Sequence, residues 1–425
     1  MTIHKPTSTS VSRRRVLAWG AAAAVAAMSR PGWLTAADRA APKSTAFDAD
    51  VWMTQWEKMI LNDIQRDRYC DKETGEEIGW LISPYLYGFY YGFMATQQAK
   101  WIDLLVDWSD AWMKRGSKEP DGYIGWPKAD GTSTWVVPNL YTDNILGEAM
   151  ALRPAVLLAG QVLNSPALKT KYGAKFKQYL DLSEQVFAKW DARCAWREVK
   201  NGGVWIVPEF GIDKDHNQWD SHYDKRKTEG FTLPDNKQNF VAEWLIAMAD
   251  LTGKPEYRRR ATMWWQVMKS RLHLRDGKYY DWNYWDPAGP WDYKPNHEPR
   301  HWVGIHPNGG YYDADLDGIV NAYQHKIVFE KTEIDRLIAS NRDFMWNGQI
   351  QGAKFKRIDG GPPDKDPKKS PGVLWHALVP YDDTLRRIFE ANHQPASWGG
   401  LIATPWYVAL AAGKLKPATT PSHTL

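Results

Sequence analysis

Histidine, arginine and tyrosine side chains gather in one stretch of the sequence. Six of the eleven histidines lie between positions 216 and 306. The densest run places Arg300, His301 and His306 shortly before a Gly-Gly pair, which Tyr311 and Tyr312 follow. A polar, glycine-containing loop that collects such groups is typical of an active site. The alternative is a loop whose histidines only cap backbone groups.

A second polar group lies at the start of a helix that the spacing predicts. Asn239 and Glu243 are four residues apart, so they share one helix face within an otherwise apolar run. Asp235 or Asn236, just before them, fits a helix cap. We therefore expect Asn239 and Glu243 to face a cleft, with Glu243 binding substrate.

Metal and nucleophile motifs are weaker. The run Asp313-Ala314-Asp315-Leu316-Asp317-Gly318 matches the first half of an EF-hand loop, but Gln324 stands where the closing glutamate belongs. Acidic residues are also common at a helix N-terminus, where they interact favourably with the helix dipole, and this explains the run without calcium. His297, His301 and His306 match no common zinc spacing, and there is no G-x-S-x-G, P-loop or dinucleotide fingerprint. We predict no metal site and no cofactor.

The aromatic content suggests the ligand. The chain holds 25 Trp, 20 Tyr and 12 Phe, and flat rings with a polar edge suit sugars or nucleobases. The first 37 residues hold five Lys and Arg and no acid, so the formal charge of +4 becomes −1 without them. Such a balance argues against non-specific nucleic-acid binding and favours sugar. We expect stacking from loop tryptophans, at Trp126, Trp219, Trp285 and Trp302, unless these only pin the loops to the body of the protein.

The N-terminal segment has the pattern of an export signal. Residues 12–17 resemble the twin-arginine motif, and an apolar stretch over 16–28 follows, too short to span a bilayer. We predict a signal peptide over 1–37, a periplasmic or secreted protein without a membrane anchor, and one domain over 38–425 with a disordered tail from Lys416. Cys70 and Cys194 permit a disulfide, and two unpaired thiols are equally compatible with the sequence.

The rest of the chain predicts a mainly all-α fold. Asn239 to Leu251 is an apolar helix, residues 252–255 form a tight Gly- and Pro-containing connection, and Tyr257 to Leu272 is a more charged helix. Further paired helices follow without an obvious linker. The pattern favours an (α/α) barrel, with apolar helices inside, charged helices outside and long loops forming a cleft at one end.

An exported, Trp-rich helical toroid with an Asn-containing inner helix and a His/Arg/Tyr loop resembles the (α/α)-barrel polysaccharide lyases of the alginate and glucuronan type, polysaccharide lyase family 38. The resemblance implies β-elimination on an anionic, uronic-acid-containing polysaccharide. It implies a tyrosine as base and acid, for which Tyr312 fits best and Tyr311 is the alternative. His306, Arg300 and Asn239 would assist the tyrosine, and His301 would help to bind substrate.

Two other functions remain open from the sequence. A glycoside hydrolase on the same barrel would use two carboxylates, such as Asp143 with Glu243 or Asp220 with Glu243. A non-catalytic carbohydrate-binding protein would use the same aromatic residues without turnover. The sequence does not choose which uronan is bound, or whether cleavage is internal or from an end.

Overall fold

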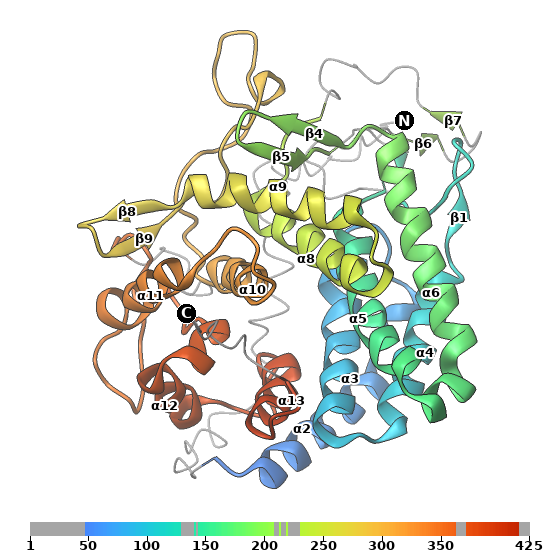
Figure 1. Ribbon diagram of the computed structural model, residues 1–425, viewed down its shortest axis with the longest axis horizontal. Helices are drawn as coiled ribbons and strands as arrows, with labels where there is room; N and C mark the ends of the chain where they lie inside the picture. The colour runs from blue at the N-terminus through green and yellow to red at the C-terminus, as the bar shows by residue number, and fades with distance from the viewer. Residues whose placement is uncertain are drawn as a thin grey trace, which may run out of the picture.

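The chain folds as an (α/α) barrel, seen in the computed structural model of Figure 1. The structure describes residues 47–128, 140–141, 143–207, 212–213, 218–219, 230–362 and 371–415. The inner elements are α3 (Ser83–Thr96), α5 (Ile145–Asn164), α8 (Asp235–Thr252), α10 (Gly310–Gln324), the 3₁₀ helix η6 (His376–Tyr381) and α13 (Gly400–Ala411). The outer helices are α2 (Ala49–Arg66), α4 (Ala99–Met113), α6 (Pro166–Ala192), α9 (Pro255–Arg271), α11 (Lys331–Ala339) and α12 (Asp383–Asn392).

The inner elements form a ring that closes between the two ends of the chain. Each of α3, α5, α8 and α10 packs on the next, α10 packs on η6, and α13 packs on both α3 and α2. At the closure, the Trp56 indole donates to the Leu401 carbonyl at 2.9 Å. A Cβ at Gly88 of α3 would lie only 3.2 Å from that same carbonyl oxygen, so glycine permits the close approach of α3 and α13.

The helical hairpin predicted from the sequence is confirmed as α8 and α9. Gly253 ends α8 in the left-handed conformation, with φ at 67°, and Pro255 begins α9. Most of α8 is buried, whereas α9 carries exposed charge on one face. This difference between an inner and an outer helix is the one that the two hydrophobic patterns predicted.

Short antiparallel pairs and single turns fill the connections. The pairs are β1 (Ser117–Lys118) with β2 (Ile124–Gly125), β4 (Trp196–Val199) with β5 (Gly202–Trp205), and β8 (His273–Arg275) with β9 (Tyr279–Asp281), while β6 (Ile212–Asp213) lies between β3 (Leu140–Tyr141) and β7 (Gln218–Trp219). The 3₁₀ turns are η2 (Tyr69–Asp71) and η4 (Pro290–Asp292), whereas η3 (Ile78–Ile82) and η5 (Ser340–Met345) are π-helical segments that directly precede α3 and follow α11. Because β5 packs on α9 and β9 on α11, these pairs cover outer helices.

One described helix, α5, is long and apolar enough to cross a membrane by length and composition. In the structure 78% of its apolar window is buried inside the protein. Its apolar surface therefore serves the core, packed against α3, α6 and α8.

The two cysteines are both free, Cys70 buried and Cys194 exposed. The predicted signal segment, 1–37, and the tail from Lys416 lie outside the described residues. The signal and the destination that it implies stay predictions.

A buried ion network joins α5 to α6. The Lys189 ammonium has no exposed surface, and it pairs with Asp143 and, at 2.5 Å, with Glu148. The Trp190 indole donates to the second Glu148 oxygen at 2.6 Å. Arg193 extends the network to Glu119. Because charges out of water need partners, this network holds the segment before α5 against α6.

Substitution of Lys189, at the centre of this network, tests how much the network stabilises the fold. Lys189→Met leaves buried Glu148 without its cation and Asp143 with Arg193 alone, so we expect a loss of about 3–5 kcal/mol in the free energy of unfolding. Lys175→Met, which breaks a half-exposed pair with Asp110, is the matched control and should cost less than about 1 kcal/mol. Denaturant unfolding measures both, and equal losses would contradict the assignment.

Candidate active site in the barrel interior

The N-terminal ends of the inner helices meet at one end of the ring. Asn144, which caps α5, donates to the carboxylate of Glu76 at 3.0 Å, just before η3 and α3. Lys237 in the first turn of α8 pairs with the same carboxylate at 2.7 Å. Asp313 in the first turn of α10 pairs with His376, the first residue of η6, at 2.7 Å. Side chains from five inner elements thus converge on one mouth.

An ion pair and two phenols form a cluster deeper in the ring. Arg153 of α5 pairs with Glu243 of α8 at 2.8 Å and donates to the Tyr87 hydroxyl of α3 at 3.0 Å. The rings of Tyr87 and Tyr91 stack with centroids 6.3 Å apart. Burial raises the pKa of Glu243, while the Arg153 guanidinium opposes that shift. Arg153 therefore favours the anionic form of Glu243.

Asp317 of α10 is the most unusual group of the site. Its side chain is exposed to water, yet desolvation raises its pKa well above the usual range, and the carboxylates of Asp313 and Glu243 raise it further. Water thus reaches a side chain that protein closely surrounds. We call this part of the ring interior, around Asp317, Glu243 and Arg153, the recess. Asp317 therefore combines contact with water and a pKa shifted toward the protonated form, although His376 and Arg153 oppose part of that shift.

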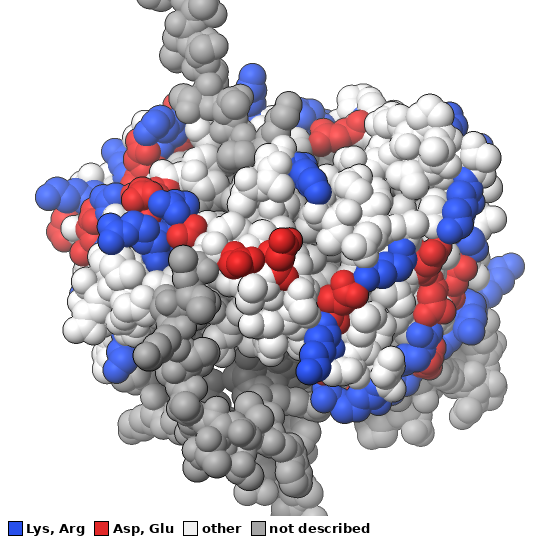
Figure 2. Space-filling view, turned by 90° about the horizontal axis from the view of Figure 1, so that it is seen from below, with Lys and Arg blue, Asp and Glu red and all other residues white. Residues whose placement is uncertain are grey.

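Charge on the outside is distributed differently. On the face shown in Figure 2, Lys and Arg alternate with Asp and Glu, and broad uncharged areas separate them. Neither sign forms a continuous field on that face. The charges on this face are mixed, whereas the ion pair of Arg153 and Glu243 is buried inside the ring, where low dielectric strengthens it.

Aromatic rings line the mouth. The centroid of the Tyr284 ring lies 5.3 Å from that of Tyr311 and 4.9 Å from that of His306. The His306 and Tyr311 rings pack edge to face, with their centroids 4.5 Å apart. Trp80 donates to Glu76 at 2.8 Å, and its ring packs against Phe240 of α8. Flat faces beside polar groups suit a sugar ring.

The structure brings Tyr312 and His306 together, as the sequence predicted, but through the backbone. The Tyr312 hydroxyl accepts a hydrogen bond from the His306 backbone N–H at 2.7 Å, and its ring packs against Trp282. Tyr312 is buried, and burial raises the pKa of its phenol. In this position Tyr312 fixes the loop that carries His306.

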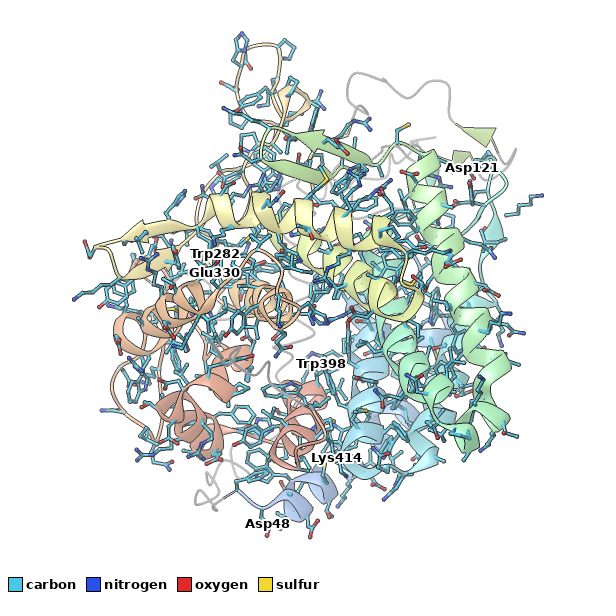
Figure 3. The ribbon with its side chains drawn as sticks, in the orientation of Figure 1. Asp48, Asp121, Trp282, Glu330, Trp398 and Lys414 are labelled. Carbon is cyan, nitrogen blue, oxygen red and sulfur yellow. The ribbon has the colours of Figure 1, made fainter. Side chains whose placement is uncertain are left out.

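Asn239 and Arg300 hydrogen-bond to other groups. Asn239 is fully buried; it donates to Asp315 and accepts from Trp264, each at 2.7 Å. Trp282, labelled in Figure 3, donates to the other Asp315 oxygen at 2.8 Å. Arg300 donates to the Gly230 carbonyl at 3.2 Å. The catalytic roles of Asn239 and Arg300 stay predictions.

The predicted stacking tryptophans have different environments. Trp126 and Trp285 are buried and donate to backbone carbonyls of Trp112 and Thr232, respectively. Trp302 is 48% exposed. The Trp219 side chain lies outside the described residues. Of the three described indoles, Trp302 presents its ring to solvent.

His301 sits beneath the mouth loop. Its ring stacks on Phe231 at 5.9 Å, and Nδ1 donates to the Trp302 carbonyl at 3.1 Å. Desolvation lowers the pKa of His301, so the neutral imidazole is favoured. His301 therefore supports the backbone that carries Trp302.

Sequence reasoning did not assign several residues of the recess to the site. Arg153 left a signal, a lone charge in an apolar helix, and Tyr87 and Tyr91 share a helix face at a spacing of four. Asp317 was considered only within the calcium pattern, and its run lies inside α10, so it forms no EF-hand loop. His376 gives no local signal, because its partner Asp313 is distant in sequence.

The carboxylate pairs suggested for hydrolysis are separated. Asp143 lies in the ion network with Lys189, whereas Glu243 lies in the ring with Arg153. Asp220 lies outside the described residues. Glu243 instead acts on Asp317, because the charge of its carboxylate raises the pKa of Asp317.

Comparison with known proteins finds no matching family model and no matching curated protein. Among solved structures, a D-mannose isomerase is similar over 86% of this chain and 97% of its own, with a TM-score of 0.47 and 13% identity. An inactive variant of the α-1,6-mannanase of Salegentibacter sp. HEL1_6, in complex with α-1,6-mannotriose, covers 86% and 99% with a TM-score of 0.46 and 12% identity. The cellobiose 2-epimerase from Spirochaeta thermophila DSM 6192 covers 84% of each chain with a TM-score of 0.43 and 10% identity.

The ion pair at the mouth predicts a pH-dependent stability. Burial by itself lowers the pKa of His376, but the carboxylates of Asp313 and Asp317 raise it above the ordinary value. The pair therefore stabilises the fold below the unfolded pKa of about 6.5, and this contribution is lost as pH rises through the folded value. Asp313→Asn should thus destabilise the protein more at pH 5.5 than at pH 9, as measured by denaturant unfolding. A loss that is equal at both pH values would contradict the pairing.

Proposed function

We propose that the protein is a carbohydrate-processing enzyme, and that its reaction is hydrolysis of a glycosidic bond in the barrel interior. The observation that supports this proposal is Asp317, a water-accessible carboxylic acid whose pKa is raised well above the usual range beside Glu243. Glycoside hydrolysis needs one protonated carboxyl and one ionised carboxylate. Burial raises the pKa of both Asp317 and Glu243, but Arg153 pairs directly with Glu243, which makes Glu243 the candidate for the ionised partner.

In this proposal Asp317 donates its proton to the glycosidic oxygen as the bond to the anomeric carbon breaks. Water adds to the anomeric carbon, and Glu243 takes the proton that the water loses. Arg153 keeps Glu243 anionic before the reaction. The Tyr87 and Tyr91 rings supply flat faces and hydroxyls for the sugar.

Substitution of the acid tests this function. Asp317→Asn removes the proton donor, so turnover should fall by on the order of 10²- to 10⁴-fold, with the folded state retained. Asp335→Asn, on the exposed face of α11 where Asp335 pairs with Lys331, is the matched control and should keep wild-type turnover. The assay is release of reducing ends from a panel of neutral and anionic polysaccharides.

The pH profile gives an independent check. Because Asp317 must be protonated, kcat should fall as pH rises through its elevated pKa. Glu243→Gln should remove the acidic limb of the profile and leave the basic limb in place. A basic limb that persists in Asp317→Asn would assign the proton donor to another group.

A uronan lyase, acting on a glucuronan- or alginate-type polymer by β-elimination, is the second candidate. The observation in its favour is the mouth, where Tyr311 and Tyr284 lie beside His306. The Glu76 carboxylate acts on both tyrosines, and it pairs with the Lys237 ammonium. Elimination needs a base for the C5 proton and a group that neutralises the carboxylate. It ranks second because burial and the Glu76 carboxylate raise the pKa of Tyr311, which disfavours the phenolate.

The product separates the two reactions. Elimination yields an unsaturated uronate that absorbs ultraviolet light, whereas hydrolysis yields reducing ends without that absorbance. For a lyase, Tyr311→Phe or Tyr312→Phe should reduce turnover by at least about 10²-fold, and Asp317→Asn should reduce it far less. If Asp317→Asn reduces turnover far more than the two tyrosine variants do, the result supports hydrolysis.

A further inference from the structure

An exposed apolar surface adjoins the mouth of the ring. Among the described residues, few large hydrophobic side chains are exposed, and Trp302 at 48% and Val303 at 39% are adjacent members of that group. They follow the segment from Trp291 to Arg300, which returns on itself through a bridge between Tyr293 and Pro299. Exposing an indole to water is unfavourable in free energy, and a ligand that covers the ring removes that unfavourable contact.

This surface is held in place. Asp292, which is buried, accepts from the Thr232 backbone N–H at 2.8 Å and from the Thr232 hydroxyl at 2.7 Å. The Gly304 carbonyl accepts from the Tyr284 backbone N–H at 2.8 Å, which ties the loop to the mouth. Little conformational entropy is therefore lost when a ligand binds here.

Glycine at 304 sets the position of the indole. Its φ is +150°, a conformation that side chains disfavour, and a Cβ there would lie 2.9 Å from the Trp302 ring. The Trp302 ring can therefore fold back over residue 304. Its centroid lies 6.4 Å from Tyr284 and 6.1 Å from His306.

The rings form a continuous path from solvent into the barrel. Trp302 contacts Tyr284 and His306, and both of these contact Tyr311 in the first turn of α10. Asp317 lies farther along the same helix. The ring contacts thus connect the exposed indole to the helix that carries Asp317.

We propose that Trp302 forms an outer subsite, and that the substrate is a polysaccharide chain whose remote sugar units bind there while another part of the chain lies beside Asp317. This inference rests on the proposed function, because it takes a sugar as the ligand. Binding energy from remote units can be used at the reacting centre. The enzyme should then discriminate by chain length.

The experiment measures binding without turnover. In an Asp317→Asn background, affinity electrophoresis through gels containing glucuronan, alginate, soluble β-glucan or mannan gives the dissociation constant for each polymer. Trp302→Ala should weaken binding of the retained polymer by about tenfold, as expected for the loss of one aromatic stack. Trp302→Phe should restore most of it, and Gly304→Ala, which displaces the indole, should also weaken binding.

Tyr293→Ala is the matched control. Tyr293 is 39% exposed on the neighbouring segment, and its removal should leave polymer binding unchanged. With Asp317 intact, Trp302→Ala should raise KM for the polymer more than for a disaccharide or trisaccharide of the same linkage.

The outcomes separate this inference from the proposed function. If the wild type cleaves a polymer that Trp302→Ala binds as tightly, the outer subsite is wrong and the function stands. If polymer binding depends on Trp302 but no product forms, the subsite stands and the function fails. If no polymer in the panel is retained, both are overturned.

Discussion

The direction of the inner helices is the constraint on which the site depends. Each inner element from α3 to η6 is followed by an outer helix that returns antiparallel, so the inner elements run the same way and their N-terminal ends lie together. First-turn residues that are far apart in sequence, such as Lys237 and Asp313, then reach the same mouth. The partial positive charge of these helix ends also favours acidic side chains there, as at Glu76.

Polar groups inside the ring are kept in water-poor surroundings only by being paired. Arg153 holds Glu243, and His376 holds Asp313. At Asp317, desolvation and the neighbouring carboxylates outweigh His376 and Arg153, so its pKa is raised well above the usual range. The interior thus contains carboxyl groups in two kinds of surroundings, two of them in ion pairs and one shifted toward its protonated form.

The sequence predicted the barrel better than it predicted the recess. Hydrophobic period and the Gly-Lys-Pro connection located α8 and α9 because they are local signals. The His and Tyr loop was located near the mouth, but its most buried member, Tyr312, uses its hydroxyl on the His306 backbone. No periodicity distinguishes such a phenol from one that faces a ligand.

Asp317 shows why the residues of the recess could not be assigned from the sequence. Its neighbours Asp313, Glu243 and Arg153 come from three different helices, and only tertiary packing reveals that they share a space. In the sequence, an acid in the first turns of a helix has an ordinary explanation. The pKa shift that singles Asp317 out depends on burial, which local spacing does not encode.

The closure of the ring between Trp56 and Leu401 bears on how the chain reaches this structure. Contacts that link the first and last helices have the greatest sequence separation in the barrel, and such contacts form slowly because the intervening chain must be ordered first. Until α13 is synthesised and docked, the apolar faces of α2 and α3 remain uncovered. An incomplete chain would therefore expose two apolar helices at its start, so α13 (Gly400–Ala411) protects the protein from aggregation as well as closing the ring.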